Sequence, residues 1–183
     1  MLKKAIALGV FLAGGLALGA EPAASGPQVG EKVPGPFKPL NATGPDAGKE
    51  ECLYCKQGSK PMVMVFAREL TPGVAALIKK LDAATAAKSE AGLASCVIVL
   101  SDAKDLAASL GKWAQAEKIT HTVLATYAAT GPAKYALAPD AAVTVLLYTK
   151  HTVKANHTFR AGELKDAGAD AVVADIAKIL PRE

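Results

Sequence analysis

Short, continuous apolar runs separated by helical segments constrain the fold of this chain more than any other feature. The runs occupy residues 62–67 (MVMVFA), 94–100 (ASCVIVL) and 143–148 (VTVLLY), with a weaker one at 122–125 (TVLA). Apolar runs of this length, without polar alternation, are typical of strands buried on both faces of a sheet. They predict a central sheet flanked by helices.

The segments between the runs carry helix signals. Thr71 is suited to cap a helix with a proline at its first position, and apolar residues then recur at helical spacing. Further helices are expected near 106–113 and 172–180. Residues 152–159 alternate polar and apolar side chains, which predicts an antiparallel partner for the preceding strand. The order β-α-β-α-β-β-α is that of an α/β domain in which the parallel strands come first.

The first twenty residues are typical of an export signal. A basic start (MLKK) precedes an apolar stretch that is short for a membrane span, and Ala20 before Glu21 is a suitable cleavage point. We therefore expect a signal peptide at 1–20, a Pro/Gly/Ala-rich leader and loop at 21–48, and the main domain at 49–183. The localisation expected is periplasmic or secreted, with no membrane association after cleavage.

The charge of the exported chain is small. With Lys3 and Lys4 removed from the 21 basic residues, 19 remain against 17 acidic ones. So small and dispersed a charge does not predict a nucleic-acid partner. Export also implies an oxidising compartment, in which two neighbouring cysteines tend to form a disulfide.

Two stretches resemble segments of the thioredoxin-like superfamily. Residues 60–82 (KPMVMVFARELTPGVAALIKKLD) resemble the strand, active-site and helix segment of thioredoxins and peroxiredoxins. Residues 124–159 resemble the region where peroxiredoxins and exported thioredoxin-like reductases run from a strand into a hairpin. The chain thus resembles a divergent exported member of this superfamily. The resemblance implies a central mixed sheet flanked by helices, with a late antiparallel hairpin.

The active site of the superfamily is not preserved at its usual positions. The resemblance places the cysteine pair of thioredoxins at Thr71 and Val74, and the proline and cysteine of peroxiredoxins at Ala67 and Val74. Valine cannot form a thiolate, so this position has no nucleophile. The cis-proline of the superfamily is also missing, because Ala142 precedes the strand expected at 143–148.

A Cys-x-x-Cys pair stands instead before the first buried run. Cys52 and Cys55 are spaced so that one helical turn can bring their sulfurs together. By the usual topology they lie at the opposite sheet edge from the active centre of the superfamily. Lys56 and its neighbouring lysines favour a thiolate, whereas Glu50 and Glu51 oppose one.

Three functional hypotheses follow. The leading one is an exported thiol–disulfide oxidoreductase in which Cys52 is the more exposed, attacking thiol and Cys55 resolves the mixed disulfide with a protein partner. The first alternative is a non-catalytic binding module with a structural disulfide. The second is a copper-handling protein, because thiolates together with Met62 or Met64 suit Cu(I).

Other features of the sequence add little to these hypotheses. Cys96 lies inside an apolar run and is expected to be an inert thiol of the core. We expect no cofactor and no resident metal, since no ligand set with recognisable spacing accompanies the cysteine pair. The redox direction, the oligomeric state and whether the chain is an enzyme are left open.

Overall fold

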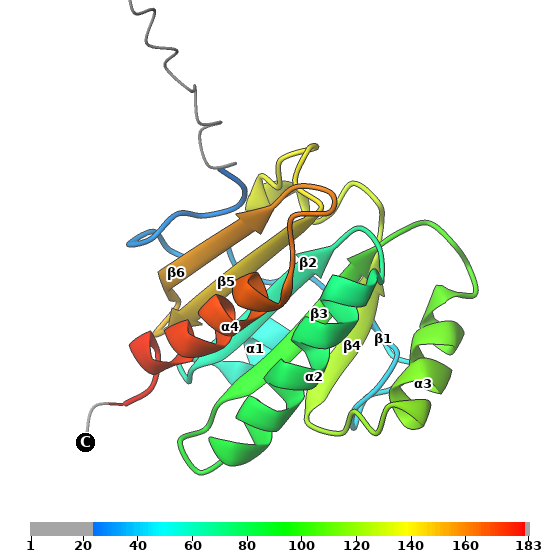
Figure 1. Ribbon diagram of the computed structural model, residues 1–183, viewed down its shortest axis with the longest axis horizontal. Coiled ribbons are helices and arrows are strands. Elements are labelled where there is room, and N and C mark those ends of the chain that lie inside the picture. Colours follow the sequence, from blue (N-terminus) through cyan, green and yellow to red (C-terminus); the bar gives the residue numbers. More distant parts are fainter. Residues whose placement is uncertain (1–23, 182–183) are drawn as a thin grey trace, which may run out of the picture.

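The computed structural model describes residues 24–181, which form one six-stranded mixed sheet (Figure 1). Its strands are β1 (Leu40–Asn41), β2 (Met62–Ala67), β3 (Ala94–Leu100), β4 (Thr122–Tyr127), β5 (Val143–Thr149) and β6 (Thr152–Phe159). Across the sheet the order is β1-β4-β3-β2-β5-β6. β2, β3 and β4 run parallel, whereas β5 pairs antiparallel with both β2 and β6. The mixed sheet and late hairpin expected from the sequence are confirmed.

Four α-helices accompany the sheet within the described residues: α1 (Leu53–Gln57), α2 (Pro72–Ala87), α3 (Leu106–Ala116) and α4 (Asp166–Ala174). Single 3-10 turns follow at η1 (Ala133–Tyr135) and η2 (Asp175–Lys178). Thr71 caps α2 as predicted, since its side-chain oxygen accepts the N–H of Val74. None of the helices described is long and apolar enough to cross a bilayer.

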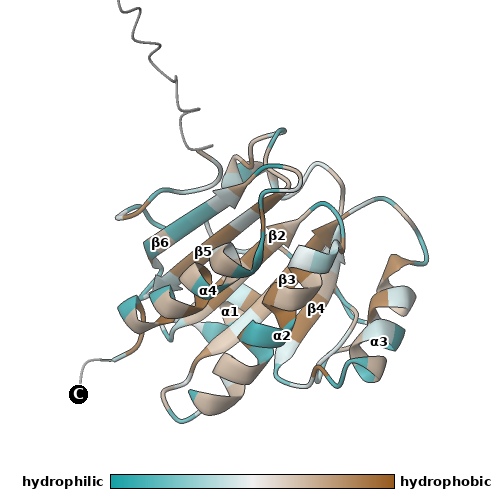
Figure 2. Ribbon diagram, viewed as in Figure 1, coloured by the Kyte–Doolittle hydropathy of each residue, from teal (hydrophilic) through white to brown (hydrophobic). Residues whose placement is uncertain are grey.

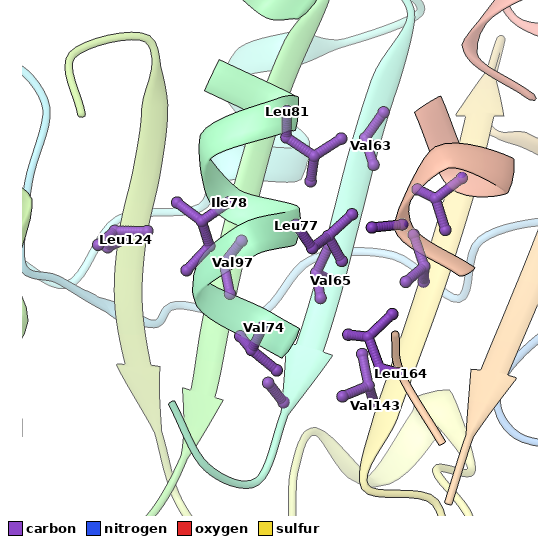
Figure 3. Close-up of a cluster of buried hydrophobic side chains, with 14 of the residues drawn as sticks. Val63, Val65, Val74, Leu77, Ile78, Leu81, Val97, Leu124, Val143 and Leu164 are labelled. Carbon is purple, nitrogen blue, oxygen red and sulfur yellow. The ribbon is translucent and has the colours of Figure 1, made fainter. Parts of the chain in front are cut away.

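Alternate side chains of the central strands enter two separate cores. Val63 and Val65 of β2 point toward α2, where they pack with Leu77 and Ile78 (Figure 3). Successive strand residues face opposite sides of a sheet, so Met64 enters the other core. Figure 2 shows apolar residues concentrated on the central strands, whereas the edge strand β6 is largely polar. Burial on both faces explains why the central strands read as continuous apolar runs.

The two faces of the sheet are covered differently. α2 and α4 lie over one face, and α1 lies behind the other (Figure 1). The second face is also covered by the proline-rich segment, whose Phe37 contacts the rings of Phe66, Tyr127 and Tyr135. The domain boundary at residue 49 stays a prediction, although residues 24–48 supply a strand and buried side chains to the same sheet. The signal peptide expected at 1–20 lies outside the described residues.

Candidate functional site

The two cysteines of the Cys-x-x-Cys pair are joined by a disulfide at the start of α1. Their Cα atoms are 5.2 Å apart, within the usual range for this bond. Cys52 occupies the N-cap position of the helix, and its sulfur accepts the backbone N–H of Cys55 at 3.1 Å. The spacing of three residues therefore allows the Cys52–Cys55 disulfide, as predicted from the sequence.

Exposure distinguishes the two sulfur-bearing residues. Cys52 is only 6% exposed, whereas Cys55 is exposed to solvent. The expectation that Cys52 is the more exposed thiol is therefore wrong. Its cause is the path of the chain, because the backbone N–H of Glu51 bonds to Pro39 and holds Cys52 down against the domain. One helical step after Tyr54, which packs inward, Cys55 faces outward.

α1 is anchored at the end of the sheet where β2 and β3 begin. The side-chain amide of Gln57 donates to the carbonyls of Pro61 at 2.6 Å and Gly92 at 2.7 Å, just before these two strands. The ring of Tyr54 lies 4.8 Å from that of His151, in the turn between β5 and β6. This confirms that the disulfide lies at the opposite edge from the N-terminus of α2.

The lysine next to Cys55 has a partner. Lys56 forms an ion pair with Asp46, and Glu51 lies 3.9 Å from the same ammonium group. The hydrogen bond from Lys56 lowers the pKa of Asp46, and the same bond raises the pKa of Lys56. The charge of Lys56 is thus largely compensated, and it is a weaker source of thiolate stabilisation than the sequence suggested.

Cys96, the third cysteine, is 1% exposed in β3, as expected for a core thiol. Burial raises the pKa of the Cys96 thiol far above its usual range, because an apolar interior disfavours the charged thiolate. Its surroundings oppose a role in disulfide exchange.

A second candidate site is a cavity of about 750 Å³ at the opposite end of the sheet, where β2 ends and β5 begins. It opens between the start of α2, the loop before β5 and the loop between β6 and α4. Thr71, Val74 and Ala142 line it, and these residues occupy the positions where the resemblance placed the superfamily's cysteines and cis-proline. No cysteine is among its lining residues, so the cavity has no thiol chemistry of its own.

Arginine and glycine residues keep this cavity in shape. Arg68 donates to three carbonyls, those of Ala129, Ala138 and Ala141, at 3.0 to 3.2 Å, and so holds the loop before β5. A side chain at Gly73 would put its Cβ only 2.3 Å from the carbonyl oxygen of Leu164. The close approach of these backbones brings α2 and the β6–α4 loop together around the cavity. No local pattern in the sequence indicates this cavity, since its walls come from three segments that are distant in the chain.

The methionines invoked for copper are parts of the core. Met62 and Met64 are 2% and 0% exposed, and the sulfur of Met62 accepts a hydrogen bond from the hydroxyl of Tyr148 at 2.9 Å. Within residues 24–181, no three His, Cys, Asp or Glu side chains gather in a group that could hold a metal ion. The copper hypothesis gains no support from this arrangement.

Comparison with known proteins places the fold. No protein-family model and no curated protein matches the chain. A Bacteroides thetaiotaomicron protein provisionally assigned as a protein disulfide isomerase aligns with a TM-score of 0.62 and 16% identity, over 86% of this chain and 94% of its own. Peroxidoxin BcpB of Mycobacterium tuberculosis aligns with a TM-score of 0.61 and 18% identity, over 84% and 99%.

A secreted Mycobacterium tuberculosis disulfide oxidoreductase, homologous to E. coli DsbE, also aligns. Its TM-score is 0.56 and its identity 13%, over 77% of this chain and 94% of its own. The chain therefore has a thioredoxin-like fold, as the sequence resemblance implied. At such low identity the likeness shows the fold alone.

Proposed function

We propose that the protein is an exported thiol–disulfide exchange protein that acts through the Cys52–Cys55 pair at the start of α1. The observation that carries this proposal is the asymmetry of the pair. The exposed Cys55 can be reached by a partner, whereas the buried Cys52 already accepts a backbone hydrogen bond at its sulfur.

In the oxidised protein, the thiolate of a partner attacks the sulfur of Cys55. A bond forms between the two sulfurs, the Cys52–Cys55 bond breaks, and its electron pair leaves on Cys52. The N–H of Cys55, 3.1 Å from that sulfur, stabilises the departing thiolate. In the reverse direction, the thiolate of Cys55 attacks a partner disulfide and Cys52 then displaces the partner. These roles are opposite to those expected from the sequence.

Export belongs to the same proposal. It is supported by the basic and apolar character of residues 1–20. One of the similar structures is of a secreted disulfide oxidoreductase. An alkaline phosphatase fusion after residue 20 would report whether this segment directs export.

The reduction potential of the pair tests the exchange function. The protein is equilibrated with glutathione buffers, and the oxidised fraction is measured after alkylation. We expect a potential between roughly −120 and −270 mV, the range of proteins that exchange disulfides. A Cys96→Ser variant keeps the pair and serves as the control, because it removes the third thiol. A value below roughly −300 mV would make the disulfide a structural one and overturn the proposal.

The cavity at the other edge favours a second candidate function, the binding of a small apolar ligand without catalysis. Its volume of about 750 Å³ lies within the usual range of ligand sites, and its walls include Pro72, Val74, Val143 and Leu164. Arg68 holds one of these walls in place through its hydrogen bonds to three backbone carbonyls.

A dye with an apolar ring system and one sulfonate group, anilinonaphthalene sulfonate, tests this candidate. We expect saturable fluorescence with the folded protein, lost in Ala76→Phe, which fills the cavity. The matched control is Ala83→Phe, also on α2 but exposed and outside the cavity. Absence of saturable binding, or equal loss in both variants, would count against a ligand site here.

A further inference from the structure

Three lysines without acidic partners surround the turn that lies against α1. Lys32, Lys60 and Lys150 are exposed, and none has a carboxylate within 4.0 Å among residues 24–181. We call them the basic face. Unlike Lys56, they carry charge that no neighbouring group compensates by contact.

Backbone and side-chain contacts hold this face together. The N–H of Lys150 donates to the carbonyl of Ser59 at 2.9 Å, which ties the β5–β6 turn to the end of α1. The ammonium of Lys32 reaches the hydroxyl of Thr152 at 3.0 Å and the carbonyl of Lys150 at 3.5 Å. Lys60 directly follows Ser59, and its side chain lies over Gly92. Lysines distant in sequence are thus gathered at one edge of the sheet.

Cys55 lies between this face and a compensated one. Each residue turns a helix by about 100°, so Cys55 is flanked on the surface of α1 by Tyr54 on one side and Lys56 on the other. Tyr54 contacts His151 in the lysine-bearing turn. On the other side Lys56 pairs with Asp46 and lies 3.9 Å from Glu51, so two carboxylates meet one ammonium group there. A partner that approaches Cys55 from the side of the turn therefore meets uncompensated positive charge.

Nearby carboxylates do not cancel this field by contact. Glu31, next to Lys32, accepts the backbone N–H of Gln28 at 2.7 Å. Glu50 lies on the other side, where its backbone forms an antiparallel bridge with Leu40 of β1. Glu90 is exposed in the turn between α2 and β3 and is the acidic group nearest in sequence to Gly92.

We propose that the basic face directs disulfide exchange at Cys55 toward cysteine-containing polypeptide segments with acidic residues beside the thiol. The proposal rests on the exchange function above and adds the class of its partner. A positive surface raises the local concentration of an anionic partner and lowers the cost of bringing a thiolate to the sulfur. A basic partner experiences the opposite effect.

Exchange with such peptides takes place in two steps. The thiolate of one peptide bonds to the sulfur of Cys55 while Cys52 leaves as a thiolate. The thiolate of a second peptide then attacks the peptide sulfur of the mixed disulfide and displaces Cys55. Two peptide thiols are oxidised to one peptide disulfide, the protein pair is reduced to two thiols, and the two thiol protons pass to the protein cysteines.

Three tripeptides that differ only in charge test the proposal: acetyl-Glu-Cys-Glu-amide, acetyl-Gln-Cys-Gln-amide and acetyl-Lys-Cys-Lys-amide. The second-order rate of opening of the Cys52–Cys55 disulfide is measured by acid quench, alkylation and mass. Each rate is corrected for the thiolate fraction of the peptide and divided by its rate with hydroxyethyl disulfide. At low ionic strength we expect the acidic peptide to react about tenfold faster than the basic one. In about 1 M salt the difference should nearly vanish.

Matched variants locate the effect. The double variant Lys60→Gln/Lys150→Asn removes two charges from the basic face, and asparagine tolerates the positive φ of 51° at position 150. The control Lys104→Gln/Lys112→Gln removes the same charge from exposed positions in and before α3. We expect the first to abolish most of the preference and the second to leave it unchanged. Equal effects in both would assign the preference to net charge and overturn the basic face.

The outcomes separate this inference from the exchange function. If none of the peptides opens the disulfide, the exchange function fails and the inference fails with it. If all three open it at the same corrected rate, exchange stands and the role of the basic face is refuted. A faster reaction of the basic peptide would also refute it. Small anionic thiols such as mercaptoethanesulfonate show whether one charge suffices or the peptide is needed.

Discussion

The three cysteines have the same side chain but differ in solvent exposure and in the pKa that their surroundings allow. Cys55 is exposed, Cys52 is 6% exposed and Cys96 is 1% exposed. Only the thiolate reacts with electrophiles, and burial raises the pKa of the Cys96 thiol. Reactivity therefore follows position in the fold.

Alkylation of the reduced, folded protein checks this ranking. We expect iodoacetamide to modify Cys55 first and Cys52 more slowly, and to leave Cys96 unmodified until urea unfolds the chain. Peptide mapping of a time course by mass spectrometry measures each site, and the unfolded protein provides the reference rates. Labelling of Cys96 in the native protein at a rate similar to Cys55 would contradict the burial argument.

A second residue, Asp175, couples stability to pH. Burial alone would raise the pKa of Asp175, but hydrogen bonds from Lys178 and His157 outweigh it and hold that pKa below the usual 3.8. A carboxyl whose pKa is lower in the folded state stabilises that state above its unfolded pKa. This contribution is lost as the pH falls through the folded pKa.

Asp175→Asn should therefore be less stable than the parent near neutral pH, and the difference should shrink as the pH drops below about 4. Urea unfolding at several pH values measures it, with the exposed Asp105→Asn as the control. A difference that stays constant down to about pH 2 would show that the ionisation of Asp175 is not its cause.

Among the elements, α2 is the one whose placement depends most on a single small residue. The backbone of Gly73 lies so close to Leu164 that a Cβ would be 2.3 Å from its carbonyl oxygen. The same contact shapes the cavity wall. Gly111 in α3 is a contrasting case, since a Cβ there would meet the carbonyl of Ala42 at an ordinary 3.4 Å.

The pair of variants Gly73→Ala and Gly111→Ala tests this difference. Gly73→Ala must move backbone, so we expect it to destabilise the fold by on the order of 2 kcal/mol. Gly111→Ala should be neutral or stabilising by up to about 1 kcal/mol, because alanine favours a helix. Urea unfolding measures both. Similar values for the two would show that the approach of α2 to Leu164 is not tight.

In the protein as a whole, the disulfide lies at the end of the sheet where β2 begins, and the cavity lies at the end where β2 stops. The two cores lie between them, one on each face of the sheet. The disulfide closes a loop of only four residues, so it restricts the unfolded chain less than a disulfide across a long loop would. Most of the stability therefore resides in the cores, and the pair can change redox state while the fold persists.

Reduction should lower the free energy of unfolding by about 2 kcal/mol and leave one cooperative transition. Urea unfolding with and without a phosphine reductant measures this change. The Cys52→Ala/Cys55→Ala variant is the control and should not respond to the reductant. Unfolding of the protein on reduction alone would show that the disulfide is a structural requirement.

Patterns within short stretches of sequence account for the strands, the capped helix α2 and the closure of the Cys52–Cys55 ring. Apolar periodicity, the Thr71 cap and the spacing of two cysteines act over a few residues and do not depend on distant contacts. The weak run at 122–125 also proved to be a strand, β4, because its neighbours β3 and β1 supply the hydrogen bonds.

Contacts between distant segments decided the rest. Which cysteine faces solvent depends on the bond between Glu51 and Pro39, and the basic face on the contact of Ser59 with Lys150. The covering of the second sheet face by Phe37 and the walls of the cavity likewise join segments far apart in the chain. A short stretch of sequence does not indicate such contacts, since they form only when the folded sheet brings these distant segments together.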